Sequence, residues 1–256
     1  MCLAVVAFDA HPAYALVIAA NRDEYHDRPA APAAWGDAPP FADILAGRDL
    51  KAGGTWLGVR RDGRWALVTN VRQGGRNDPV ARSRGDLVPR VLNAGGTPAD
   101  AVAAVASAAD GYNGFNLLAG DVAGAHWTSN RGDGVRRLAA GVHGLSNALL
   151  DTPWPKLVRT MRAVHAWLAR SDGDTAALFA ALADRARAAD DELPDTGVTR
   201  EWERLLSSPF IVSERYGTRC STVLTVDRTG RAVFRERTFD ASGTPTGETV
   251  EAFAVR

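Results

Sequence analysis

The fold is decided near the amino terminus, where residues 2–24 read CLAVVAFDAHPAYALVIAANRDE. Two apolar runs, residues 3–8 and 14–20, flank a polar, proline-containing break, which is typical of a turn between two paired strands. We therefore expect a β-hairpin here. Its open end would bring the charged tetrad Asn21-Arg22-Asp23-Glu24 close to Cys2.

The composition of the whole chain indicates one soluble globular domain. The 256 residues carry 30 Lys and Arg against 30 Asp and Glu, and 46% are hydrophobic. A balanced charge gives no overall field that would favour nucleic acid or an anionic membrane surface. We find neither a secretory signal nor an apolar run long enough for a membrane helix. We expect a single domain over residues 1–256, no integral membrane segment, no nucleic-acid partner, and a cytoplasmic location.

The sequence has no pattern that is typical of a metal site or a nucleotide-binding site. The only cysteines are Cys2 and Cys220, which rules out a disulfide scaffold and fits a reducing compartment. The five histidines have no metal-ligand spacing, and no phosphate-binding glycine loop is present. We expect no metal site and no nucleotide cofactor.

The pattern of strands and helices predicts an α+β fold. A second hairpin is expected over residues 55–60 and 65–69, around an Asp-Gly turn. Helices are expected at 85–93, 97–109 and 154–169 and from near Asp174, with strand-like runs before and after them. The segment 29–40 is rich in Pro and Ala and is expected to be an ordered loop. Strands, then helices, then strands favour layered antiparallel sheets over an alternating parallel one.

Cys2 is the main candidate for chemistry. Removal of Met1 would leave a thiol and a free α-amine on one residue, with reference pKa values of about 8.5 and about 7.7 to 8.0. The amine could then act as the base for its own nucleophile. From the cysteine alone, a small hydrophobic residue at the start of an edge strand is the favoured interpretation.

The charged tetrad could tune that thiol. An arginine near a thiol favours the thiolate, and a carboxylate can hold an α-ammonium group. A solvated charged turn is the alternative interpretation of four consecutive polar residues.

The spacing of several motifs resembles the NRDE family, the homologues of transport and Golgi organization protein 2. The matching blocks occur in the family's order and span nearly the whole chain: Met1-Cys2, Asn21-Arg22-Asp23-Glu24, Gly53-Gly54-Thr55-Trp56-Leu57-Gly58, Tyr112-Asn113-Gly114-Phe115-Asn116, Gly144-Leu145-Ser146-Asn147-Ala148-Leu149 and Tyr216-Gly217-Thr218-Arg219. This resemblance implies an Ntn-hydrolase-like four-layer αββα sandwich of two antiparallel sheets.

The family is also similar, more distantly, to cysteine Ntn amidases of the penicillin V acylase and bile salt hydrolase group. That similarity implies a catalytic set in which Cys2 is the nucleophile, Arg22 and Asp23 are its polar neighbours, Asn70 and Asn147 are oxyanion donors, and Arg219 is a further cation. In those amidases the Arg and Asp are separated, whereas here they are adjacent, so Glu24 is an alternative carboxylate. Each Asn could instead be a turn residue. If Arg219 faces the site, strand alternation places Cys220 on the opposite face, in the core.

Two functions remain open from the sequence. The first is a thiol amidohydrolase that acts on linear C–N amide bonds of a small-molecule or acyl ligand and needs no cofactor. The second is a non-catalytic binder of haem or an acyl lipid, because the family that the chain resembles is linked with haem trafficking and acyl-lipid metabolism. In that case Cys2 or a histidine could be the axial ligand of the haem.

Overall fold

The opening hairpin forms as expected in the computed structural model, which describes residues 2–170 and 173–256. Strand β1 (Cys2–Phe8) pairs antiparallel with β2 (Tyr14–Tyr25), and Cys2 lies directly opposite Arg22. Because β2 continues to Tyr25, the tetrad 21–24 belongs to the strand and is not a solvated turn. Asn21, Arg22 and Asp23 are buried.

Six strands form the first sheet, in the order β10-β1-β2-β11-β12-β13. The carboxy-terminal strands continue it as a meander on β2: β11 (Tyr216–Asp227), β12 (Arg231–Phe239) and β13 (Pro245–Ala254). Strand β10 (Gly141–Leu145) closes the other edge against β1. All of these pairings are antiparallel.

Seven strands form the second sheet, in sequence order: β3 (Ala30–Trp35), β4 (Ile44–Asp49), β5 (Leu57–Arg60), β6 (Trp65–Asn70), β7 (Phe115–Gly120), β8 (Ala125–Ser129) and β9 (Val135–Arg137). The segment 29–40 was expected to be a loop, and this was wrong. Its first part is the edge strand β3, which tolerates Pro32 because an edge strand needs hydrogen bonds on one side only.

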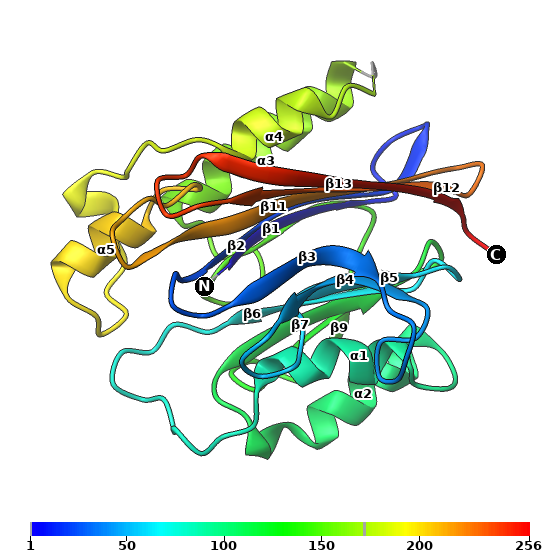
Figure 1. Ribbon diagram of the computed structural model, residues 1–256, viewed down its shortest axis with the longest axis horizontal. Helices are drawn as coiled ribbons and strands as arrows, with labels where there is room; N and C mark the ends of the chain where they lie inside the picture. Colours follow the sequence, from blue (N-terminus) through cyan, green and yellow to red (C-terminus); the bar gives the residue numbers. More distant parts are fainter. Residues whose placement is uncertain (1, 171–172) are drawn as a thin grey trace.

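Helices cover the outer faces of both sheets (Figure 1). Helices α1 (Leu87–Leu92) and α2 (Pro98–Ser107) lie on the second sheet, and Thr97 forms the capping box of α2. Helices α3 (Pro155–Arg170) and α4 (Ala176–Leu182) lie on the first sheet, and α5 (Arg200–Leu206) lies beyond its end. Short 3-10 turns occur at Arg84–Asp86, Ala109–Gly111 and Asp190–Glu192. The result is the expected αββα sandwich.

Strand alternation divides the apolar residues into two cores. In β1 the even-numbered residues Ala4 and Val6 join the core between the sheets. The odd-numbered residues Leu3 and Val5 join a second core under α3 and α4. Cys2 belongs to the first group, so its side chain faces the interior between the sheets. Among the described residues, no helix is long and apolar enough to cross a membrane.

Candidate functional site

Four residues form a row across the first sheet, on the face toward the second sheet. Cys2 lies opposite Arg22 in β1 and β2, Arg22 lies opposite Cys220 in β11, and Cys220 lies opposite Thr238 in β12. Residues directly opposite each other in antiparallel strands have their side chains on the same face. The row therefore places the two thiols on either side of one guanidinium.

A cavity of about 440 Å³ opens over this row, between the two sheets. The first sheet contributes Cys2, Arg22 and Glu236 to its wall, and the second contributes Asn70 at the end of β6. The segment 78–85, after β6, forms a further part of the wall. The cavity is large enough for a small ligand, and its polar groups come from both sheets.

The Cys2 side chain is buried, with 7% of its surface exposed. Burial raises the pKa of the Cys2 thiol above its ordinary value. The Arg22 charge and a hydrogen bond from the backbone N–H of Asp23 oppose this rise in pKa, because both stabilise the thiolate. At rest the thiol is therefore protonated, and it needs a base to become a nucleophile.

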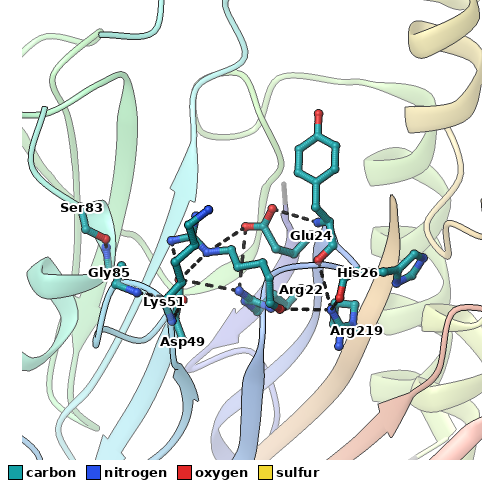
Figure 2. Close-up of polar contacts among 11 residues, drawn as sticks. Arg22, Glu24, His26, Asp49, Lys51, Ser83, Gly85 and Arg219 are labelled. Carbon is teal, nitrogen blue, oxygen red and sulfur yellow. Dashed lines mark hydrogen bonds and ion pairs between the residues drawn. The ribbon is translucent and has the colours of Figure 1, made fainter. Parts of the chain in front are cut away.

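Arg22 has no close ion pair. Its Nη2 lies 3.8 Å from a carboxylate oxygen of Glu24 and 3.9 Å from one of Asp49. Asp49 instead forms a close ion pair with Arg28, at 2.6 Å. Figure 2 shows Arg22 between these carboxylates and Arg219. Arg22 Nη1 is buried and has no hydrogen-bond partner among the described residues. This guanidinium can therefore still bind a ligand or a thiolate.

Asp23 and Glu24 lie on opposite faces of the first sheet. The Asp23 carboxylate accepts a hydrogen bond of 2.7 Å from Thr218 on the side of the helices, where its charge interacts with the buried Lys156. Burial raises the pKa of Asp23, and Lys156 and Thr218 oppose that rise. Glu24 lines the cavity on the same face as Arg22. The tetrad thus supplies one carboxylate to each side of the strand.

The two candidate asparagines lie next to each other, but only one lines the cavity. Asn70 lines it, and its side-chain amide makes no hydrogen bond to the rest of the described chain. Asn147 is buried, and its Nδ2 donates to the Asn70 carbonyl at 3.0 Å. Asn147 therefore fixes the backbone that carries Asn70.

Arg219 and Cys220 both line the cavity, although strand alternation predicts opposite faces. The pairing register shifts between Thr218 and Cys220, so that Arg219 is the extra residue of a β-bulge. The Arg219 Nη1 donates to the carbonyls of Tyr25, His26 and Arg28. The bulge thus corrects the expectation that Cys220 lies away from the site.

Among residues 2–170 and 173–256, no group of three or more His, Cys, Asp or Glu side chains could hold a metal ion. None of the described residues that line the cavity is a histidine or methionine. A haem in this cavity could therefore take only a cysteine as its axial ligand. Burial raises the pKa values of Cys2 and Cys220, so a haem iron would have to displace the proton of either thiol in order to bind it.

The family model described as Transport and Golgi organisation 2 matches residues 1–241. The chain belongs to this family. It is 34% identical to the mouse Transport and Golgi organization 2 homolog and 38% identical to the bovine Transport and Golgi organization protein 2 homolog. Each alignment covers 97% of both chains.

The fold of this family member is similar to that of a solved amidase. The Caenorhabditis elegans N-acylethanolamine-hydrolyzing acid amidase ortholog matches with a TM-score of 0.50 and 13% identity, over 87% of this chain and 92% of that chain. At that identity the similarity shows the fold, which is Ntn-hydrolase-like, and not the activity.

Three residues at the site were not predicted from the sequence. Glu236 in β12 is buried and accepts a hydrogen bond of 2.7 Å from the Ala33 N–H, which joins the two sheets beside Cys220. Arg84 reaches the cavity from the segment after β6. Lys156 is buried behind the first sheet, and burial lowers its pKa to about 8. None of them belongs to a motif with a specific spacing, so no signal in a single sequence marks them.

Proposed function

We propose that this protein is an N-terminal cysteine amidohydrolase that cleaves linear amides through an acyl-enzyme on Cys2. The observation that carries the proposal is the position of the Cys2 side chain in the cavity wall, opposite Arg22 and on the same face. A cysteine that served only as packing would not need a guanidinium opposite it or a cavity above it. Removal of Met1 is required, because the α-amine of Cys2 is the base.

The proposed reaction has two steps. The α-amine takes the thiol proton, the sulfur attacks the amide carbonyl carbon, and the C–N bond breaks as the α-ammonium protonates the leaving amine. Water then attacks the thioester and gives a proton to the α-amine. The C–S bond breaks, the α-ammonium returns its proton to the sulfur, and the carboxylic acid leaves, so that the thiol and the free α-amine are both restored.

Asn70 is the proposed oxyanion donor. Its amide lines the cavity and is not engaged by other described residues, whereas Asn147 holds the Asn70 backbone. An amide donor aimed at the developing oxyanion lowers the barrier by roughly 3 to 4 kcal/mol. Arg22 stabilises the thiolate, and Arg219 orders the turn at the end of β2 through three carbonyls.

The test combines intact mass with turnover. The mass of the purified protein should show that Met1 is absent, and a panel of acyl amides should give a burst of amine release. Cys2→Ala should lose turnover by roughly 10³-fold or more. Cys220→Ala is the matched control, a second buried cysteine of the same cavity, and should stay within about tenfold of the native rate. Retained Met1, or equal activity of the two variants, would contradict the proposal.

A further inference from the structure

Six arginines line the cavity: Arg22, Arg28, Arg48, Arg82, Arg84 and Arg219. Two of them are neutralised within the protein, since Arg28 pairs with Asp49 at 2.6 Å and Arg82 pairs with Asp86 at 3.0 Å. Arg22 has carboxylates only at 3.8 and 3.9 Å. Across the described ranges, no carboxylate lies within 4.0 Å of the other three.

Two of those three arginines use their guanidinium groups in contacts within the protein. Arg219 gives its Nη1 to three backbone carbonyls. Arg48 donates to the Gly53 carbonyl and stacks over the Phe41 ring, 3.4 Å from its centroid. Arg84 is different, because it makes one hydrogen bond, from Nη1 to the Gly114 carbonyl at 3.1 Å. The remaining N–H groups of Arg84 are open to a ligand.

Arg84 lines the same cavity as the proposed nucleophile. It lies on the segment that closes the cavity, and its charge interacts with Glu24 and Cys2. Burial lowers the pKa of Arg84, and the charges of Glu24 and Cys2 oppose that change. The burial of a guanidinium that has no ion-pair partner costs free energy, and the binding of an anion offsets that cost.

The acidic residues of the wall are already engaged. The wall includes five acidic residues, although the first of them holds its carboxylate on the helix side of the sheet: Asp23, Glu24, Asp49, Asp78 and Glu236. Each of them accepts at least one hydrogen bond, from Thr218, the Tyr25 N–H, Arg28, the Val80 N–H and the Ala33 N–H, respectively. Asp86, which lies outside the lining, neutralises Arg82. Among the described residues, Arg84 is therefore a lining arginine that has no carboxylate within 4.0 Å and only one hydrogen bond.

We propose that the substrate is an N-acyl compound whose amine part carries a carboxylate, and that Arg84 binds this carboxylate. This inference rests on the proposed function, because it names the substrate class of the same site. One carboxylate would neutralise the Arg84 charge and match the planar fork of its guanidinium. The apolar part of the wall, Ala31, Pro32, Trp56 and Val68, suits the acyl chain, which leaves the anion to the amine part. Arg84 is thus a specificity-determining residue.

Binding to the Cys2→Ala protein tests the inference without turnover. N-decanoylglycine should bind at least about tenfold more tightly than N-decanoylglycinamide by calorimetry, and added salt should weaken only the acid. Arg84→Gln in the same background should remove this preference and leave the amide unchanged. Arg76→Gln is the matched control, because Arg76 is an exposed arginine just before this segment and does not line the cavity; it should keep the preference.

Other outcomes separate the two proposals. Equal binding of acid and amide, or a preference that survives Arg84→Gln, would overturn the role of Arg84. Tighter binding of N-decanoyl-O-phosphoethanolamine than of the glycine conjugate would overturn the choice of a carboxylate over a phosphate. If Arg84→Gln fails to fold by circular dichroism, Arg84→Lys keeps the charge without the fork and should reduce the preference. If the native protein binds N-decanoylglycine but does not cleave it, the proposed amidase activity is refuted and the proposed ligand class is not.

Discussion

Cys2 is a buried thiol whose charged neighbour lies directly across a strand pair. Burial raises its pKa, and the Arg22 guanidinium works in the opposite direction. These two effects make the reactivity of the thiol depend on pH and on one neighbouring side chain, and both dependences can be measured.

We expect iodoacetamide to alkylate Cys2 with a midpoint above the ordinary thiol value of about pH 8.5. Only the thiolate reacts, so a raised pKa moves the profile to higher pH. Arg22→Met should move it higher still. Mass spectrometry of the Cys220→Ser protein, which leaves one cysteine, gives the profile directly. A midpoint below about 8.5 would contradict the dominant effect of burial. No effect of Arg22→Met would show that the Arg22 charge does not stabilise the thiolate.

The pairing of Cys2 and Arg22 was predictable from the sequence pattern itself. Asn70 and Arg219, which also line the cavity, were predicted only through the family resemblance, and the positions of Cys220 and Arg84 were not predicted. Cys2 and Arg22 face each other because a short hairpin fixes their register. Cys220 joins them only because a bulge adds one residue to β11. No sequence pattern marks that bulge. Arg84 was missed for a similar reason, since its position depends on where a long connecting segment folds back.

The segment that carries Arg84 is held by a close contact between two glycines. A Cβ atom on Gly54 would lie 2.5 Å from the Gly85 carbonyl, and the Thr55 N–H donates to that carbonyl at 2.9 Å. Both neighbours are backbone atoms, so the segment would have to move if a side chain were added.

Gly54→Ala should therefore destabilise the protein by about 1 to 3 kcal/mol and weaken the binding of N-decanoylglycine. Gly95→Ala is the control, because a Cβ atom there meets nothing within 4 Å, and it should change stability by less than about 0.5 kcal/mol. Urea unfolding measures both variants. Equal stabilities would mean that the segment shifts at little cost.

A histidine and an aspartate link β10 to the loop that carries Asn147. His143 Nδ1 lies 3.0 Å from Asp151, and Asp151 accepts from the Gly144 N–H at 2.7 Å. The hydrogen bond to Asp151 raises the pKa of His143. Burial alone would raise the pKa of Asp151, but bonds from His143 and Gly144 lower it below its ordinary value.

These opposite shifts predict a pH window for the link. The His143 contribution is complete below its unfolded pKa of about 6.5 and is lost as the pH rises through the raised folded value. The Asp151 contribution is complete above about 3.9 and is lost as the pH falls through the lowered folded value. The free energy of unfolding lost in His143→Gln should therefore be larger at about pH 5.5 than at about pH 8.5. Equal losses at both values would contradict this link.

At the scale of the whole molecule, a buried ion pair joins the segment just after β6 of the second sheet to helix α5. Arg72, just after β6, lies 3.3 Å from Glu203 in α5, and their side chains are 5% and 2% exposed. Arg72 also stacks on Trp154, and Thr196 donates to Glu203 from both its N–H and its hydroxyl. This pair is one of the charged contacts between the two halves of the sandwich.

Glu203→Leu alone should cost about 3 to 5 kcal/mol, because it leaves a buried guanidinium without its partner. The double variant Arg72→Met and Glu203→Leu should recover part of that loss. Guanidinium chloride unfolding of the two single variants and the double variant completes the cycle. A double variant as unstable as the sum of the single variants would show that the two charges do not interact.

The layered architecture was predicted from the order of strands and helices and from the family resemblance. The edge strand β3 was missed because its prolines and alanines carry no strand signal of their own. It forms because Glu236 and Thr249, from the opposite sheet, bond to Ala33. Contacts of that kind are properties of the assembled sandwich and not of the segment.

The spacing of the two thiols determines how this cavity responds to oxidants. Cys2 and Cys220 lie two strands apart with Arg22 between them, so their Cα atoms are separated by about 9 to 10 Å. That separation exceeds the limit of about 7 Å for a disulfide without backbone movement. Peroxide would therefore convert Cys2 to a sulfenic acid that the neighbouring cysteine cannot resolve. Recovery would require a small thiol such as glutathione to enter from solution.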